Sequence, residues 1–336
     1  MDTKLNLILL LARRNLREQG ESNAVLRYDL VTNGPNVMSV LRVRNEDPVL
    51  LPPRWRHWMA AIAVTILFVL GMPAVAAEVL RLGVTPVILH DQYSAMLAFR
   101  NYLETKLGRP VELVSRNSYR QTIDMIERRE LDVAWVSAFP YVYLHHHDNV
   151  RLVAMPLIKG RPTFRAYLIV SADDKVTSSV LQLRDKIFAY ADPYSHTGFV
   201  VPKYDLRAAG EDPKTFFSRT FFCAGHKNVV RAVASGLADG GSVDSFVWDS
   251  LAVVEPELTA KTRIAGRSQE FGSPPIVAGH HVSNDDVGRL RRILLGMNED
   301  PEGSLILRKL QVDRFVAGDS RSFDGVEEMM RATGDL

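Results

Sequence analysis

From residue 78 onward, short apolar runs alternate with segments whose apolar residues recur every three or four positions. The runs predict strands, and the recurring spacing predicts helices. Alternation of this length predicts an α/β fold with parallel sheets that helices cover on both faces, and ligands on such sheets bind beyond the carboxyl ends of the strands. The predicted strands are 79–84, 111–114, 131–136, 151–155, 164–170, 186–190, 221–223, 263–265 and 273–278, and the predicted helices are 93–107, 118–129, 137–144, 199–209, 224–235, 243–254, 285–297 and 302–310.

One predicted strand-to-helix turn concentrates the candidate chemistry. It holds Ser195, His196, Thr197 and Gly198. The first turn of a helix has backbone N–H groups without internal partners and a partial positive charge, so it can bind an oxyanion. The two hydroxyls add donors there, and the glycine lets an anion approach the backbone closely. The alternative is that Ser195 or Thr197 only caps the helix.

Length, charge and cysteine content narrow the class of protein. The chain has 336 residues, enough for two domains. Its formal net charge of +2 is too small to indicate nucleic acid or a charged membrane surface as a partner. Cys223 is the single cysteine, so an internal disulfide is impossible, and no cysteine and histidine pair has zinc-ligand spacing. We therefore expect neither a metal nor a cofactor.

The segment that precedes residue 78 has the order of a secretory signal. Residues 54–57 are basic, an uncharged apolar run follows, and residues 74–77 are small. This order predicts a signal peptide over 54–77, cleaved after Ala76 or Ala77, and export to the periplasm.

The apolar run of this signal is shorter than the roughly 20 residues that a membrane span needs. An uncleaved membrane anchor is the alternative. Residues 1–53 have no sustained pattern. We expect them to be an untranslated or disordered extension, or a short cytoplasmic tail if the anchor is retained.

Six segments of the exported part carry a family resemblance. They are 108–113, 131–135, 162–170, 192–199 with Pro202, 224–226 and 273–277. In order and interval they resemble the periplasmic substrate-binding proteins of phosphonate, phosphite and phosphate ABC transporters, the PhnD-like family. The resemblance covers most of residues 78–310.

The resemblance implies a two-lobed, type II-like periplasmic binding fold that closes on its ligand like a hinged jaw. Each lobe is expected to be a mostly parallel sheet flanked by helices. Lobe one is expected at 78–165 and 276–336, and lobe two at 170–272. Residues 164–170 and 275–278 are the expected hinge strands.

The resemblance also implies which residues hold the anion. The family's phosphate-binding turn falls on residues 195–198, its helix-opening histidine on His226, and its tyrosine at a helix start on Tyr119. Serine, threonine, tyrosine and backbone N–H groups all donate hydrogen bonds to oxyanions. Ser137 falls at the end of another predicted strand and joins the candidates.

Departures from the family pattern bear on the ligand. Members that bind aminoalkylphosphonates are expected to have tyrosine in place of Phe164, and acids in place of Pro274 and near Phe246. A buried ammonium without a carboxylate partner is costly. A compact oxyanion is therefore expected: phosphite, phosphate or a simple phosphonate. Asp244 could accept a hydrogen bond from a protonated oxyanion, or it could cap the following helix.

Cys223 leaves a further alternative open. It lies three residues before His226, at the end of a predicted strand. A thiolate there would suit arsenite, a soft ligand that one relative in the family binds. The other interpretation is a small buried apolar residue, the usual environment of a free cysteine.

The expected function is that of a monomeric periplasmic solute-binding protein, which delivers its oxyanion to an ABC permease. The alternative is a sensory binding protein that signals to a membrane histidine kinase, which an uncleaved anchor would suit. An enzyme is disfavoured. Ser195 and His196 are adjacent on one turn, a poor geometry for a nucleophile and its base, and the chain has no GxSxG motif.

Overall fold

The computed structural model describes residues 78–85, 93–116 and 118–336. These residues belong to one compact unit, Ala76–Leu336. The expected signal peptide and the 1–53 extension lie outside the described residues. Within the described ranges, no helix combines the length and the apolar character that crossing a membrane requires.

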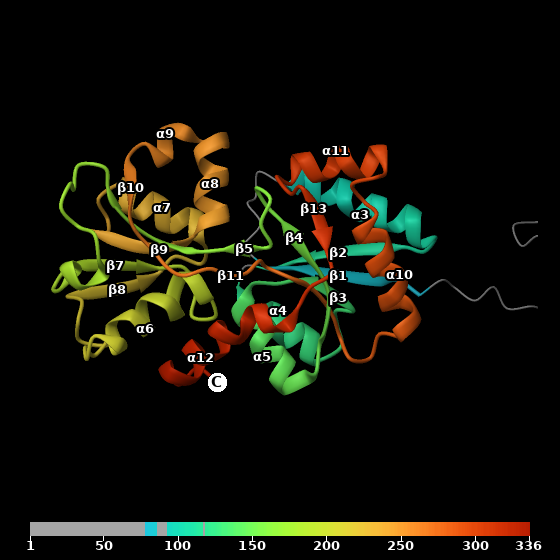
Figure 1. Ribbon diagram of the computed structural model, residues 1–336, viewed down its shortest axis with the longest axis horizontal. Helices are drawn as coiled ribbons and strands as arrows, with labels where there is room; N and C mark the ends of the chain where they lie inside the picture. The colour runs from blue at the N-terminus through green and yellow to red at the C-terminus, as the bar shows by residue number, and fades with distance from the viewer. Residues whose placement is uncertain (1–77, 86–92, 117) are drawn as a thin grey trace, which may run out of the picture. The chain divides into compact units, whose positions relative to one another are not determined.

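A six-stranded sheet in the order β13-β4-β12-β3-β1-β2 forms the core of the first lobe. Helices α3, α10 and α11 cover one face of this sheet, and α4 and α5 cover the other (Figure 1). The strands are β1 (Leu80–Val84), β2 (Val111–Ser115), β3 (Val133–Trp135), β4 (Arg151–Leu157), β12 (Ile276–Ala278) and β13 (Arg314–Val316). The helices are α3 (Tyr93–Leu107), α4 (Tyr119–Glu127), α5 (Ala138–Asp148), α10 (Asn284–Leu295) and α11 (Pro301–Lys309).

A five-stranded sheet in the order β10-β6-β9-β7-β8 forms the second lobe. Helices α7 and α8 pack on one face, and α6 packs on the other (Figure 1). The strands are β6 (Ala166–Ser171), β7 (Ile187–Tyr190), β8 (Arg219–Phe222), β9 (Gly240–Asp244) and β10 (Thr262–Arg267). The helical elements are η2 (Val180–Leu183), η3 (His196–Val200), α6 (Val201–Ala208), α7 (His226–Ala234), α8 (Ser245–Val254) and α9 (Pro256–Thr259).

Both sheets are mixed rather than mostly parallel. Strand β1 is parallel to β2 and β3, and β7 is parallel to β8 and β9, as the alternating pattern predicts. However, β12, β4 and β13 join the first sheet antiparallel, and β6 and β10 join the second antiparallel. The antiparallel strands β4, β6, β10 and β12 flank the places where the chain passes from one lobe to the other.

The prediction of a helix over 243–254 was wrong at its start. Residues Gly240–Asp244 form β9, in the middle of the second sheet, and α8 begins at Ser245. The glycines at the start of this strand indicate a turn in the sequence, yet here they permit close packing. A Cβ on Gly241 would lie 2.5 Å from Val229 Cγ1 of α7, and one on Gly240 would lie 2.5 Å from Leu183 Cδ1.

The two segments that cross between the lobes are tied to each other. They pair as β5 (Thr163–Phe164) and β11 (Phe271–Gly272), and the expected strand 164–170 is divided at Arg165 into β5 and β6. The Glu270 carboxylate accepts hydrogen bonds from Arg161 and Thr163, each at 2.9 Å, and from Arg165 at 2.8 Å. One carboxylate therefore holds both crossing segments together.

The C-terminal helix was not predicted from the sequence. After η4 (Ser320–Phe323), α12 (Asp324–Thr333) packs against α5 of the first lobe and α6 of the second. Lys203 of α6 donates to both carboxylate oxygens of Asp335, at 2.9 and 2.8 Å. The C-terminal segment therefore contacts both lobes.

We expect Gly241→Ala to lower the free energy of unfolding by about 1–3 kcal/mol, because the added methyl overpacks the contact between β9 and α7. Gly288→Ala is the matched control: Gly288 lies in α10 and a Cβ there would meet nothing within 4 Å. That change is expected to stabilise by about 0.5–1 kcal/mol. Denaturant unfolding of both variants measures the two changes in the free energy of unfolding. Equal changes in the two variants would contradict the close packing at Gly241.

Candidate functional site

The turn that follows β7 places Ser195 at the start of a helix. Ser195 is the N-cap of η3, a π-helical turn that leads directly into α6. Its hydroxyl oxygen accepts a hydrogen bond from the backbone N–H of Gly198 at 3.1 Å. A Cβ on Gly198 would lie 2.4 Å from Ala191 Cβ and 3.0 Å from His226 Cε1, so only glycine fits here without displacement. Ser195 therefore does cap the helix, and the turn packs tightly.

His226 opens α7 and is buried. Its Nδ1 accepts the backbone N–H of Asp244 at 3.1 Å, so Nδ1 carries no proton. In the neutral ring, Nε2 then carries the proton and donates it to Ser195 Oγ at 3.2 Å. Burial lowers the pKa of His226 to about 3, which keeps the ring neutral. These bonds join the η3 turn, the start of α7 and the end of β9.

Asp244 caps a helix with one of its two carboxylate oxygens. As the N-cap of α8 it accepts the backbone N–H of Phe246 on Oδ1 at 2.8 Å. Its Oδ2 is buried and has no hydrogen-bond partner among the described residues. Burial raises the pKa of this carboxyl to about 7; the backbone N–H groups of Phe246 and Val247 oppose the rise, and the charge of Asp249 adds to it. Asp244 therefore offers an acceptor when charged and a donor when protonated.

Thr197 and Tyr119 add two more buried hydroxyls. Within the described ranges, neither Thr197 Oγ1 nor Tyr119 OH has a hydrogen-bond partner. The carbonyl of Thr197 accepts Ser242 Oγ at 2.6 Å, which fixes this turn beside β9. Tyr119 is the first residue of α4 in the first lobe, yet its ring packs in an apolar cluster of the second lobe. Burial raises its pKa well above the usual value, and the charges of Asp192 and Asp244 add to this effect, whereas the nearby Ser195 hydroxyl opposes it.

The structure thus brings four of the expected elements to one place. The η3 turn, the start of α7, the start of α8 and the start of α4 converge through the contacts of Ser195, His226, Asp244 and Tyr119. Helix N-termini, hydroxyls and an imidazole N–H suit an oxyanion, and the Asp244 carboxyl suits an oxyanion that carries a proton.

Asp192 is a neighbour of the site that sequence reasoning missed. It is buried, and its Oδ1 accepts the backbone N–H of Tyr194 at 2.8 Å. Burial raises its pKa, while the backbone N–H groups of Tyr194 and Tyr119 oppose the rise. Asp192 therefore links the second lobe to the start of α4. In the sequence, the Asp-Pro pair that begins the turn was the feature that could have indicated this residue.

His196 faces the lobe crossing. Its ring is fully buried and meets the Phe271 ring of β11 edge-on, with centroids 4.3 Å apart. Neither ring nitrogen has a hydrogen-bond partner in the part of the chain that the structure describes, and burial lowers its pKa to about 3. Phe164 contacts the same Phe271 ring, at 6.4 Å between centroids. Both residues therefore lie at the hinge.

Ser137 and Cys223 lie at element ends. Ser137 follows β3 and is the buried N-cap residue of α5, but its side chain makes no capping hydrogen bond. Cys223 follows β8, is half-buried, and packs beside the apolar cluster of the second lobe. Burial raises the pKa of its thiol to about 11, so the thiol stays protonated at neutral pH. Among the described residues, no group of three or more His, Cys, Asp or Glu side chains is arranged to hold a metal ion.

Three curated relatives are similar to this chain. The phosphonates-binding periplasmic protein of Escherichia coli K12 is 24% identical over 63% of this chain and 64% of its own length. The probable ABC transporter phosphite binding protein PhnD1 of Prochlorococcus marinus is 21% identical over 76% of this chain and 89% of its own length. The phosphate-import protein PhnD of Mycolicibacterium smegmatis is 24% identical over 55% of this chain and 60% of its own length.

Solved structures share the fold. PhnD1 of Prochlorococcus marinus, in complex with methylphosphonate, matches with a TM-score of 0.71 at 20% identity, over 77% of this chain and 99% of that one. A binding protein component of an ABC phosphonate transporter from Pseudomonas aeruginosa matches with the same TM-score and identity, over 77% and 87%. These likenesses confirm the expected two-lobed periplasmic binding fold.

Residues 82–323 match the family described as the periplasmic substrate-binding protein of phosphonate ABC transporters. The match covers more than half of the chain and includes both sheets together with the Ser195, His226 and Asp244 elements. The expected resemblance is thereby confirmed: this chain belongs to the periplasmic substrate-binding proteins of phosphonate ABC transporters.

Proposed function

We propose that this protein captures a small oxyanion of phosphorus in the periplasm and delivers it to an ABC permease. The observation that carries the proposal is the set of buried polar atoms at Tyr119, Thr197 and Asp244 that lack partners among the described residues. Each unsatisfied buried group costs about 1–3 kcal/mol, so a ligand that pairs all three gains affinity. The family supports transport as the role.

Three apolar residues support a compact ligand: Phe164, Phe246 and Pro274 lie where members that bind aminoalkylphosphonates are expected to have a tyrosine or acids. Phe246 and Pro274 also line a small apolar cavity of about 10 Å³, together with Trp135 and neighbours. Trp135 Nε1 donates to the carbonyl of Pro274 at 2.9 Å, so this polar atom is used within the wall. None of the three positions 164, 246 and 274 carries an acid that could pair with an ammonium group. We therefore favour phosphite, phosphate or methylphosphonate over an aminoalkylphosphonate.

The hydrogen bonds of His226 support binding rather than catalysis. A serine nucleophile needs a neighbouring nitrogen that can take its proton. Here Nε2 of His226 carries a proton and donates it to Ser195 Oγ, because Nδ1 accepts the backbone N–H of Asp244. His226 therefore cannot act as the base for Ser195 in this tautomer.

The protonated state of the Cys223 thiol disfavours the arsenite alternative. Soft metalloid ligands bind thiolate, and the pKa of Cys223 is raised to about 11 by burial. The sensory alternative depends on the N-terminal segment, which lies outside the described residues.

We expect Thr197→Ala to weaken oxyanion binding about ten- to a hundred-fold, because a hydrogen bond to a charged group is worth roughly 1.5–3 kcal/mol. Isothermal titration with methylphosphonate, phosphite and phosphate measures the change. Thr333→Ala is the matched control: Thr333 is equally buried, but its hydroxyl bonds to the carbonyls of Met329 and Met330 and to the Asp335 carboxylate, all in the C-terminal segment. It should lower stability and leave affinity intact. Unchanged affinity in Thr197→Ala would overturn the proposed site.

The Asp244 carboxyl should make the stability of the ligand-free protein depend on pH. Its folded pKa of about 7 lies above the unfolded value of 3.8, so stability is highest when the group is protonated in both states. Stability is then lost as pH rises from about 4 to about 7, by up to about 1.4 kcal/mol per pH unit.

Asp244→Asn is expected to remove this loss. As pH rises through this window, the free energy of unfolding of the natural protein should fall relative to that of the variant. Denaturant titrations of both ligand-free proteins between pH 4 and 8 test it, and a constant difference across the window would show that burial does not shift this carboxyl.

A further inference from the structure

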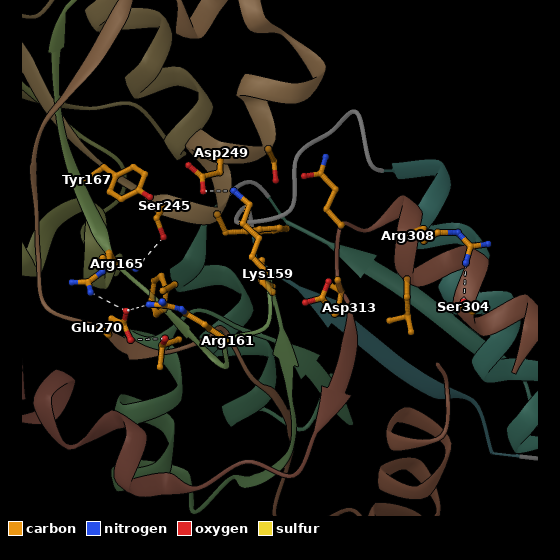
Figure 2. A pocket seen from close by; sticks show the side chains of 18 residues that line it. Lys159, Arg161, Arg165, Tyr167, Ser245, Asp249, Glu270, Ser304, Arg308 and Asp313 are labelled. Atoms are coloured by element: carbon orange, nitrogen blue, oxygen red, sulfur yellow. Dashed lines mark hydrogen bonds and ion pairs between the residues drawn. The ribbon is translucent and has the colours of Figure 1, made fainter. Parts of the chain in front are cut away.

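A turn of the first lobe reaches across to the second lobe. Ile158 and Arg161 form a bridge that closes the turn, and Lys159 and Gly160 occupy its tip in the left-handed region, with φ of 51° and 75°. Lys159 Nζ lies 2.6 Å from Asp249 Oδ2 on α8 (Figure 2). The ion pair therefore joins a loop that continues β4 to a helix of the other sheet.

The turn is fixed to the first lobe at its base. The backbone N–H of Gly160 donates to Asp313 Oδ2 at 2.7 Å, and the backbone N–H of Asp313 donates to the carbonyl of Leu157 at 2.8 Å. Asp313 immediately precedes β13, an edge strand of the first sheet. A rotation of the two lobes would therefore move Lys159 with the first lobe and Asp249 with the second.

The pair crosses an open space rather than a packed interface. Residues from both lobes line a cavity of about 690 Å³ around it, including Ser250 of α8 and Leu307 and Arg308 of α11. Figure 2 shows the Lys159 side chain extended toward Asp249 and away from Arg308, which bonds to Ser304. The neighbouring cations Arg161 and Arg165 pair with Glu270. In the described part of the chain, Lys159 is the cation that pairs with Asp249.

Asp249 shares its helix with the ligand-site carboxyl. Asp244 caps the start of α8, and Asp249 lies five residues further on. The position of α8 relative to the first lobe therefore sets where Asp244 sits against Tyr119. An interaction that holds α8 toward the first lobe favours the arrangement in which the atoms of the site converge.

We propose that Lys159 and Asp249 are positioning residues for ligand capture: their ion pair holds the second lobe closed over the oxyanion without touching it. The proposal rests on the proposed function. An exposed ion pair contributes little, and the Lys159 side chain is 72% exposed, so the expected change in affinity is about two- to five-fold. Salt screens such a pair, and the effect should fade at high ionic strength.

A double-mutant cycle tests the pair. Lys159→Gln, Asp249→Asn and the double variant are compared with the natural protein by titration with methylphosphonate, phosphite and phosphate, at about 20 and 500 mM salt. Each single variant should weaken binding about two- to five-fold at low salt, and the double variant should be no weaker than either single one. Arg100→Gln is the control, because Arg100 pairs with Glu104 inside one helix of the first lobe. It should leave affinity unchanged.

The charge swap Lys159→Asp with Asp249→Lys supplies a rescue. It should restore affinity that Lys159→Asp alone reduces. A loss in Asp249→Asn without any loss in Lys159→Gln would mean that Asp249 acts on Asp244 through its charge, and would overturn the closing role. Additive losses in the double variant would overturn it as well.

Small-angle scattering of the ligand-free proteins separates this proposal from the proposed function. Lys159→Asp should increase the radius of gyration at low salt, and the swap should reverse the increase. If none of the three oxyanions binds the natural protein, the proposed function fails while the closing role is still decided by this measurement. Equal radii in all variants would overturn the closing role alone.

Discussion

The buried imidazole of His226 is the contact on which the geometry of the site depends. Its two nitrogens join the end of β9, through the N–H of Asp244, to the η3 turn, through the hydroxyl of Ser195. Both roles require a neutral ring, and burial keeps it neutral. Because one side chain at the start of α7 holds the two other element ends, the donors of three helix starts are aligned before any ligand arrives. Such preorganisation reduces the conformational entropy that is lost when a ligand binds.

Tyr119 makes this arrangement depend on both lobes. It comes from the first lobe, but its ring is buried in a cluster of the second. Its hydroxyl, Thr197 Oγ1 and Asp244 Oδ2 are buried atoms that have no hydrogen-bond partner among the residues that the structure describes. Apolar burial of the ring favours closure, whereas the unpaired polar atoms oppose it. A ligand that pairs those atoms only in the closed form shifts the balance toward closure.

The contacts between the lobes differ in how a rotation of one lobe against the other would affect them. Glu270 ties the two crossing segments together near the pivot, where a rotation moves atoms least. The Lys159–Asp249 pair instead joins a surface loop to a helix across an open cavity. A rotation of the lobes would leave the first kind of contact in place and would separate the residues of the second kind. Helix α12 adds packing against α5 and α6, which ties both lobes to the C-terminal segment.

The sequence by itself determined the elements whose signals are local. The helix expected at 93–107 coincides with α3 because its apolar spacing and the Gly108 and Pro110 stop lie within the segment. The turn at residues 195–198 was predicted because hydroxyls and a glycine follow a short apolar run. Tertiary structure decided the rest. Gly240 and Gly241 became a central strand because α7 and η2 pack too closely for side chains.

The same division holds inside the site. Capping by Asp244 follows from its place before a helix, but the burial of its second oxygen, away from any partner in the described part of the chain, follows from the elements packed around it. His196 has the chemistry of a donor in the sequence, yet the fold turns it onto Phe271 at the hinge. A residue type fixes which hydrogen bonds are available. Packing between segments far apart in the chain decides which of them are made, because burial and direction are properties of the assembled fold.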